Sequence, residues 1–201
     1  VAGIPRSGVA AARLRTQYDW EKYAYWYRSF GRMMYNPDSD PEICRRAFGD
    51  DAQARALQSA LANASHILPL VTSAHLPSAA CDAYWPEVYW NQPMAGEPSP
   101  NPYWDTPAPK VFQNVSPLDP QMFCGIAEFA DELMGERSGK YTPVEVAQWL
   151  EDFSGAAERD LARAGKPSSV DLLRIEIDVE IQAGLGRFFA AKLRSGGLFA
   201  L

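Results

Sequence analysis

The chain has 201 residues, of which 47% are hydrophobic and 22% are charged, and its net charge at pH 7 is −6. This composition is typical of a folded globular protein and excludes disorder throughout the chain. No basic block offsets the negative charge and no run of 18 apolar residues occurs, so the sequence argues against nucleic-acid and membrane partners.

The first predicted element is a long helix over residues 7–35. Its apolar positions recur every three or four residues, as on one face of an α-helix: Trp20, Tyr23, Tyr27, Phe30 and Met34. Trp26 and Met33 widen this face, which predicts that the helix packs against more than one neighbour. The helix is expected to end at Asn36-Pro37, because proline disfavours the α conformation of the preceding residue.

Two further helices are predicted before the middle of the chain. Asp40 followed by Pro41 is a typical helix start and predicts a short helix that ends near Phe48. The next helix runs from about residue 51 to residue 66 or beyond. Pro69 is expected to kink or end it, because proline cannot donate to the helical hydrogen bonds.

Residues 78–117 have no helical period. Seven of the 16 prolines lie between Pro86 and Pro109, a density that excludes a helix interior and a central strand. The sequence therefore predicts one long, irregular loop. Loops of this length inside a compact domain are uncommon and are usually functional or disordered.

Helical order resumes after this loop. One helix is predicted over residues 119–134, from an N-cap at Asp119 to a stop at Gly135. The next begins at Thr142-Pro143-Val144-Glu145, which combines an N-cap, a proline in the first turn and a capping-box glutamate. Its apolar residues are expected to face inward: Val146, Trp149, Leu150, Phe153, Ala157 and Leu161.

The last predicted helix is capped by Ser168 and runs to about Arg194. Its apolar residues fall on more than one face, which indicates a central helix. The sequence thus predicts an all-α fold, a helical bundle of about six helices with one long proline- and aromatic-rich loop. We expect a single helical domain over residues 1–201. The chain starts at Val1 and ends on apolar residues, so we also expect it to be part of a longer, multidomain protein.

The sequence contains no recognisable catalytic or cofactor motif. His66 and His75 lie nine residues apart, without the spacing of a metal site, and are interpreted as two unrelated polar residues. Gly184-x-Gly186 follows no strand, so it predicts close helix packing and no dinucleotide site. Cys44, Cys81 and Cys124 define no disulfide framework. A single disulfide between two of the three cysteines is one interpretation. The favoured interpretation is that all three are small, buried side chains. No catalytic residue, metal site or cofactor is assigned.

Aromatic and polar side chains are concentrated in the loop. Aromatic rings stack on the apolar faces of sugars, while amides and carboxylates bind their hydroxyls. The candidate ligand-binding residues are therefore Trp85, Glu87, Tyr89, Trp90, Asn91, Tyr103 and Trp104. Alternatively, the same rings, together with Tyr84, would anchor the loop to the helices. This second interpretation is the favoured one.

Arginine and carboxylate residues give weaker signals. Arg28 and Arg32 lie four residues apart on one helical face, where they would hold an anionic group such as a uronate or form a solvated surface. The solvated surface is the favoured interpretation. A pair of catalytic carboxylates for glycoside hydrolysis cannot be selected from 25 acidic residues, because the pair is defined by its distance in space.

One segment resembles a known family. Residues 26–38, Trp-Tyr-Arg-Ser-Phe-Gly-Arg-Met-Met-Tyr-Asn-Pro-Asp, are similar to a stretch that follows the catalytic barrel in large bacterial glycoside-hydrolase-like proteins, the α-glucuronidases being the nearest named relatives. Residues 138–150 are similar to a later part of the same helical region. These motifs are a helix end, a turn and a capping box. The resemblance therefore implies a helical C-terminal region and carries over no catalytic residue.

The resemblance implies an accessory domain of a carbohydrate-active enzyme. Such a domain would support a catalytic barrel in the same polypeptide, lend aromatic residues to a sugar site or mediate dimerisation, in a secreted or periplasmic protein. The barrel itself is absent, because no alternation of strands and helices occurs. The chain alone is therefore not expected to be an enzyme. The alternative is a stand-alone helical binding or protein-interaction module with no enzymatic role.

Overall fold

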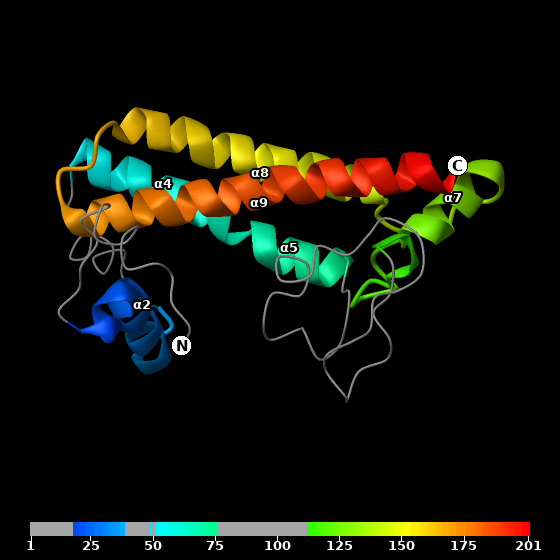
Figure 1. Cartoon of the computed structure of the whole chain (residues 1–201). Coiled ribbons are helices and arrows are strands. Elements are labelled where there is room, and N and C mark those ends of the chain that lie inside the picture. The colour runs from blue at the N-terminus through cyan, green and yellow to red at the C-terminus, as the bar shows by residue number, and fades with distance from the viewer. Residues whose placement is uncertain (1–17, 39–48, 50, 76–111) are drawn as a thin grey trace. The chain divides into compact units, whose positions relative to one another are not determined.

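A computed structural model describes residues 18–38, 49, 51–75 and 112–201, and all structural statements below concern these residues. Within them the protein is helical and has no β-strand (Figure 1). The only β-type contact there is an isolated bridge between Phe123 and Tyr141. The predicted all-α class is therefore confirmed for the described part of the chain.

The described helices match most of the predicted segments. They are η1 (Asp19–Tyr23), α2 (Ala24–Tyr35), α4 (Ala52–Ser65), α5 (Ile67–Ala74), η3 (Phe112–Asn114), α7 (Ile126–Met134), α8 (Pro143–Ala164) and α9 (Val170–Ala200). Only His66 separates α4 from α5, so these two correspond to one predicted helix. Five of the six predicted segments are thus present in the ranges described. The sixth, at residues 40–48, lies outside them, as does most of the predicted loop.

The chain divides into two compact units. Unit 1 comprises Val1–Ala62 and Ala157–Glu180, and unit 2 comprises Asn63–Ala156 and Ile181–Leu201. The helices α4, α8 and α9 contribute residues to both. Each unit has its own group of packed apolar side chains.

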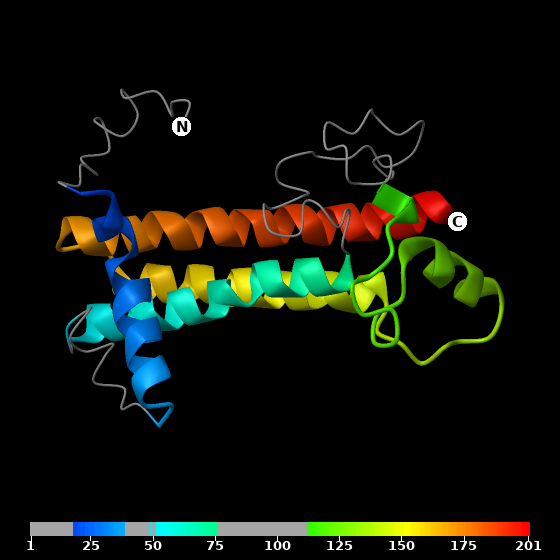
Figure 2. The ribbon, with the colours of Figure 1, turned by 90° about the horizontal axis from the view of Figure 1, so that it is seen from below.

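Unit 1 is built on small side chains. Ala54, Ala56 and Leu57 of α4 are buried with Ala164 of α8 and Leu172 of α9. Alanines let neighbouring helix backbones approach closely, and leucine fills the remaining space. The helix α2 belongs to the same unit and is drawn in blue in Figure 2. It contacts this cluster through Tyr25, which is only partly buried.

The turn from α8 to α9 is held by one side chain of α4. The Gln53 amide nitrogen donates to the carbonyl oxygens of Ala164 and Lys166 at 2.9 and 2.8 Å, and its oxygen accepts from the Ser168 backbone N–H at 3.3 Å. Gly165 stands between them with φ of +66°, a conformation that favours glycine. Gln53 thereby satisfies backbone groups that the end of α8 leaves unpaired.

Unit 2 has the larger core. It combines α5, η3, α7, the first half of α8 and the second half of α9, and its fully buried large side chains include Ile67, Phe112, Ile126, Leu150 and Phe189. The predicted inward face of α8 is confirmed, since Val146, Leu150 and Ala157 are buried and Trp149, Phe153 and Leu161 are partly buried. Arg194 of α9 also forms a two-point ion pair with Glu151 of α8, at 3.1 and 2.7 Å.

The two glycines of α9 differ in their surroundings. A Cβ atom on Gly186 would stand 2.2 Å from the Ser154 Oγ and 3.1 Å from a methyl carbon of Ile67. A Cβ on Gly184 would meet nothing within 4 Å. The prediction of close helix packing is therefore confirmed for Gly186 and wrong for Gly184. Gly186 allows α9 to approach α8 and α5 more closely than any larger residue would.

Two predicted helix starts are wrong by a few residues. The Asp119 carboxylate accepts from the N–H groups of Gln121 and Met122, which makes a turn, and α7 begins only after Gly125. The last helix is capped by Ser169 rather than Ser168, because the Ser169 Oγ accepts from the Leu172 N–H. Aspartate and serine stabilise turns and helix starts by the same kind of hydrogen bond, so sequence does not separate the two.

Two other expected boundaries also differ. The first described turn of the N-terminal helix is the 3-10 helix η1, and α9 continues past Arg194 to Ala200. The predicted break at Pro69 falls three residues earlier, at His66, and Pro69 lies in the first turn of α5. A proline is tolerated in a first turn because the N–H it lacks has no helical partner there.

The start of α8 supports a first prediction. The Glu145 N–H donates to the Thr142 Oγ1 at 3.2 Å, and the Thr142 N–H donates to the Glu145 carboxylate at 2.8 Å, so the predicted capping box is present. Thr142→Ala should lower the free energy of unfolding by about 1 kcal/mol, and Thr142→Ser, which keeps the hydroxyl, by much less. Urea unfolding measures both variants. Equal midpoints for the alanine and serine variants would contradict the role of the hydroxyl.

Candidate functional site

The sugar-binding candidates lie outside the described residues. This applies to Trp85, Glu87, Tyr89, Trp90, Asn91, Tyr103 and Trp104, and to Cys44 and Cys81. His75 and Phe112, the described residues on either side of positions 76–111, pack together with their ring centroids 3.9 Å apart.

The described part of the chain instead has a large apolar surface on η1 and α2, called below the aromatic face of α2. We define the aromatic face as seven side chains, each about half exposed or more: Trp20, Tyr23, Trp26, Tyr27, Phe30, Met33 and Met34. No residue of α2 is buried. The prediction that this helix packs against more than one neighbour through its apolar face is therefore wrong within the described structure.

The helix α2 directs its aromatic face away from unit 1. Tyr25 is the residue of α2 that packs on the apolar cluster of this unit, so the Tyr25 side of the helix faces that cluster. Phe30 lies about 140° around the helix from Tyr25, at 100° per residue. Periodicity identified the apolar face correctly, but it does not specify whether that face meets the same chain or another molecule.

The aromatic face is partly ordered by its own rings. Trp26 and Phe30, four residues apart, stack with centroids 5.0 Å apart and an angle of 6° between their planes. Arg28 and Arg32 lie on the opposite side of the helix, the side of Tyr25, where they are nevertheless exposed and form no ion pair with a described residue. This agrees with the interpretation of the arginine pair as a solvated surface. The aromatic face itself carries no charged side chain.

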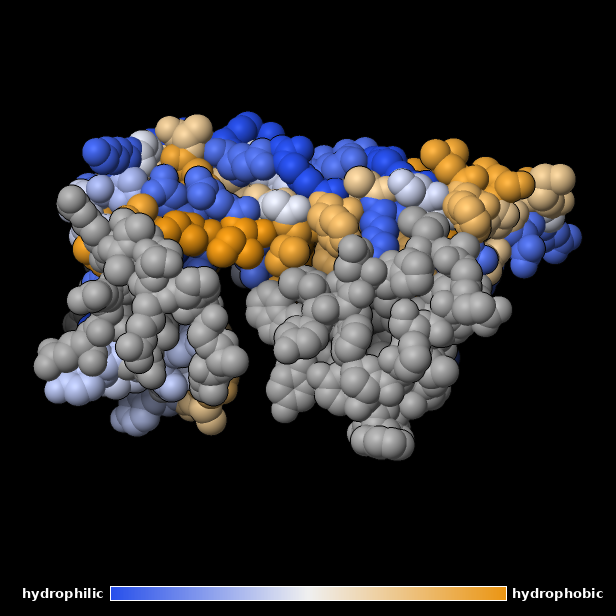
Figure 3. Space-filling model, in the orientation of Figure 1, coloured by the Kyte–Doolittle hydropathy of each residue, from blue (hydrophilic) through white to orange (hydrophobic). Residues whose placement is uncertain are grey.

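Unit 2 has a second apolar surface along α9. Ile181 and Phe188 are 55% and 40% exposed, and Leu198 and Phe199 are 76% and 58% exposed. Figure 3 shows apolar surface on this helix and at its C-terminal end. The prediction of apolar residues on more than one face of α9 is confirmed by these side chains together with the buried Val179 and Phe189.

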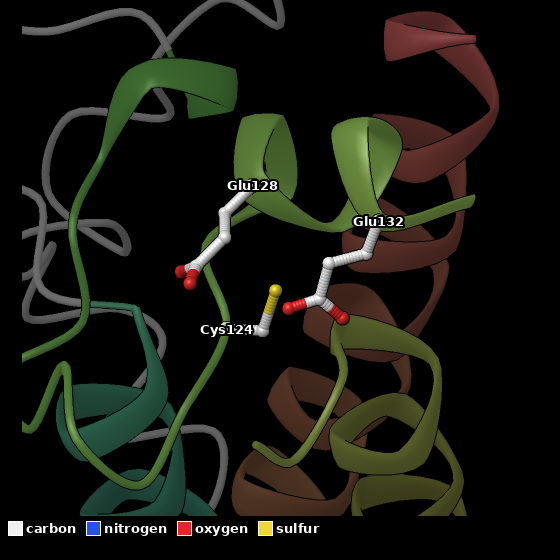
Figure 4. Close-up of side chains that lie close together, drawn as sticks. All are labelled: Cys124, Glu128 and Glu132. Carbon is white, nitrogen blue, oxygen red and sulfur yellow. The ribbon is translucent and has the colours of Figure 1, made fainter. Parts of the chain in front are cut away.

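Three side chains in unit 2 have the donor atoms of a metal site. The Cys124 Sγ and carboxylate oxygens of Glu128 and Glu132 all lie within 4.8 Å of one another (Figure 4). Cys124 immediately precedes the N-cap of α7, while Glu128 and Glu132 lie on successive turns of that helix. The spacing of four residues places all three on one side. A thiolate and two carboxylates would suit a zinc-type cation.

These donors already have partners within the protein. Glu128 accepts from the Lys140 ammonium and from the Gly125 N–H, and Glu132 accepts from the Ser138 N–H. Burial, followed by the charges of Glu128 and Glu132, raises the pKa of Cys124 to about 12, so the thiol is protonated at neutral pH. A cation would therefore have to displace both Lys140 and the thiol proton. The arrangement as described stabilises the start of α7 and the loop that follows it.

Sequence reasoning missed this cluster. Metal-site motifs of cysteine and histidine are absent from the sequence, and the signal here is instead Cys-x3-Glu-x3-Glu. This spacing brings the three side chains together when the glutamates lie on one face of a helix. The two histidines contact different aromatic rings. His66 stacks on Phe153 with centroids 4.8 Å apart, and His75 lies against Phe112. Among the cysteines, Cys124 is a free, buried thiol, in agreement with the favoured interpretation.

The Cys124 environment leads to a second prediction. Its thiol should react with a disulfide reagent at pH 8 at least about 100-fold more slowly in the folded protein than in urea, because the thiolate is scarce and buried. The measurement uses a Cys44→Ser/Cys81→Ser variant, so that only one thiol reports. Reaction at the unfolded rate without urea would contradict the protonated, buried state.

Comparison with protein-family models, with curated proteins and with solved structures found no match. None of the described helices is both long and apolar enough to cross a membrane.

Proposed function

We propose that this chain is a non-catalytic helical domain that binds another folded protein surface through the aromatic face of α2. The observation that carries the proposal is the exposure of the aromatic face, while Tyr25, about 140° around the helix from Phe30, packs on the apolar cluster of unit 1. Trp, Tyr, Phe and Met are enriched in the buried centres of protein interfaces. A contiguous exposed patch of such residues usually marks a binding surface.

The arrangement on α2 also suits a specific recognition mode. Tyr23, Trp26, Tyr27, Phe30 and Met34 follow the spacing by which one helix inserts into an apolar groove. Two of the anchors, Trp26 and Phe30, hold each other by stacking, so less side-chain entropy is lost when a partner binds. Aromatic anchors of this kind carry most of the binding energy in measured interfaces.

The resemblance supports a more specific form of the proposal. The segment similar to the glycoside-hydrolase-like proteins, residues 26–38, is most of α2 and the turn after it. In this form the chain is an accessory domain of a bacterial carbohydrate-active enzyme, secreted or periplasmic, beside a catalytic barrel of the same polypeptide. The aromatic residues of the predicted loop would then be available to a sugar site. The alternative remains a stand-alone binding module with no enzymatic role.

Oxidative footprinting tests the proposal on the product of the complete gene. If α2 lies in an interface, hydroxyl radicals should oxidise Met33 and Met34 at least about 5-fold more slowly than Met134. Met134 is 88% exposed in unit 2 and serves as a reference of the same residue type. Oxidation of all three methionines at similar rates would refute the proposed interface. A complete gene with no sequence for a barrel would favour the stand-alone module.

A third prediction follows from the absence of a catalytic motif. The chain alone should not hydrolyse aryl-glycosides or uronides above the rate of a buffer control. The assay uses micromolar protein and long incubation, so that weak activity is detected. Turnover that disappears when one carboxylate of this chain is replaced by its amide would overturn the non-catalytic assignment.

A further inference from the structure

The aromatic face of α2 is large enough to form a dimer by itself. Its seven side chains are each about half exposed, and side chains of this size bury about 150–250 Å² when fully enclosed. Each copy thus offers roughly 700 Å² of mostly apolar surface. A standard interface buries about 800 Å² per partner, so two copies of this face approach the area of a stable complex.

The face is also compatible with itself. In a two-fold symmetric interface the same patch meets itself, and any charge near the axis would lie close to its own copy. The aromatic face carries no charged residue, and Arg28 and Arg32 lie about 160° around the helix from Phe30. Nothing on the face selects a charged partner, whereas flat rings and flexible methionines can interleave with their copies.

We propose that two copies of this chain associate through the aromatic faces of their α2 helices. This inference rests on the proposed function, and the partner that it assigns to the aromatic face is a second copy of the chain. Phe30 lies near the middle of the face, stacked on Trp26, and is the residue closest to the symmetry axis. In the dimer, the outward side of α2 becomes buried, which accounts for an amphipathic helix whose apolar side faces away from its own unit.

A membrane surface is the less favoured occupant. Helices that lie in a membrane interface place their basic residues at the level of the lipid headgroups. The polar side of α2 carries only two basic residues, Arg28 and Arg32, where such helices are usually rich in them, and the chain as a whole carries a net charge of −6, which opposes binding to anionic lipid.

Sedimentation equilibrium of the whole chain at several micromolar concentrations tests the proposal. The chain should sediment as a dimer, and Phe30→Arg should raise the dissociation constant more than 30-fold, because each dimer then buries two unpaired charges. Tyr35→Arg is the matched control. Tyr35 is 86% exposed on the same helix but lies about 140° from Phe30, so this variant should remain a dimer. Circular dichroism verifies that both variants fold.

The outcomes separate this inference from the proposed function. A monomeric chain whose Met33 and Met34 are protected in the complete gene product would refute the dimer and leave the protein-binding role intact. A dimer that Phe30→Arg does not weaken uses another surface and also refutes the inference. Sedimentation with neutral or anionic lipid vesicles, lost in Phe30→Arg while the chain stays monomeric, would assign the face to a membrane and overturn both.

Discussion

Gly186→Ala should lower the free energy of unfolding by about 3 kcal/mol, whereas Gly184→Ala should raise it by about 0.5–1 kcal/mol. The two residues are two positions apart in α9, and each substitution adds one methyl group to a helix. The difference lies in their neighbours. The methyl group at position 186 would stand 2.2 Å from the Ser154 Oγ, while that at position 184 would meet nothing within 4 Å.

The cost at Gly186 has two physical sources. The Ser154 side chain is fully buried and donates to the Leu150 carbonyl at 2.7 Å, so moving its oxygen breaks a buried hydrogen bond. If α9 moves instead, the contacts of Ile67 and Phe189 in the core of unit 2 are loosened. At Gly184 the only change is the removal of a residue that weakens helices.

Urea unfolding of the two single variants measures the difference, and a double variant tests its origin. Ser154→Ala in the Gly186→Ala background removes the nearest clashing atom and should recover part of the lost stability. Equal and small effects of the two glycine substitutions would show that α8 and α9 pack less closely at this point than described.

Acidification from pH 7 to pH 5 should cost the protein about 2 kcal/mol through His75 alone. The His75 side chain is fully enclosed, and burial, assisted by the charge of Lys192, lowers its pKa from 6.5 to about 3. Its Nε2 atom is buried and has no hydrogen-bond partner among the residues that the structure describes. The imidazole is therefore neutral in the folded protein over most of the acidic range.

The sign follows from the difference in proton binding. Below pH 6.5 the unfolded chain protonates this histidine while the folded protein does not, so protons favour unfolding. The contribution of His75 to stability is complete above pH 6.5 and is lost progressively as the pH falls towards 3. Because a pKa difference of one unit corresponds to about 1.4 kcal/mol, the loss reaches about 5 kcal/mol at the acidic end.

His75→Leu provides the comparison. Leucine keeps an apolar contact with Phe112 and removes the buried unpaired nitrogen, so the variant should fold and be less sensitive to pH. Groups common to both proteins cancel in the difference, including Glu145 and Glu151, whose lowered pKa values make them titrate at more acidic pH. The same pH dependence in both proteins between pH 7 and 5 would refute the buried, neutral state of His75.

Local sequence determined the parts of this fold that rest on neighbouring residues. Thr142, Pro143 and Glu145 specify the start of α8 by hydrogen bonds within four residues, and the structure contains those bonds. The spacing of Val146, Leu150 and Ala157 defined the buried face of α8 for the same reason. The predicted helix start at Asp119 was wrong because an aspartate side chain stabilises a turn as readily as it caps a helix.

Only the tertiary structure decided which apolar faces are buried and which side chains meet. The 3.6-residue period is the same for α8, whose apolar face forms the core of unit 2, and for α2, whose aromatic face points outward. Gly184 and Gly186 are indistinguishable in sequence, and only the position of Ser154 separates them. The contact of Lys140 with Glu128 likewise requires the loop after α7 to fold back towards the start of that helix. Periodicity sets which residues share a face, whereas packing between distant segments sets what that face touches.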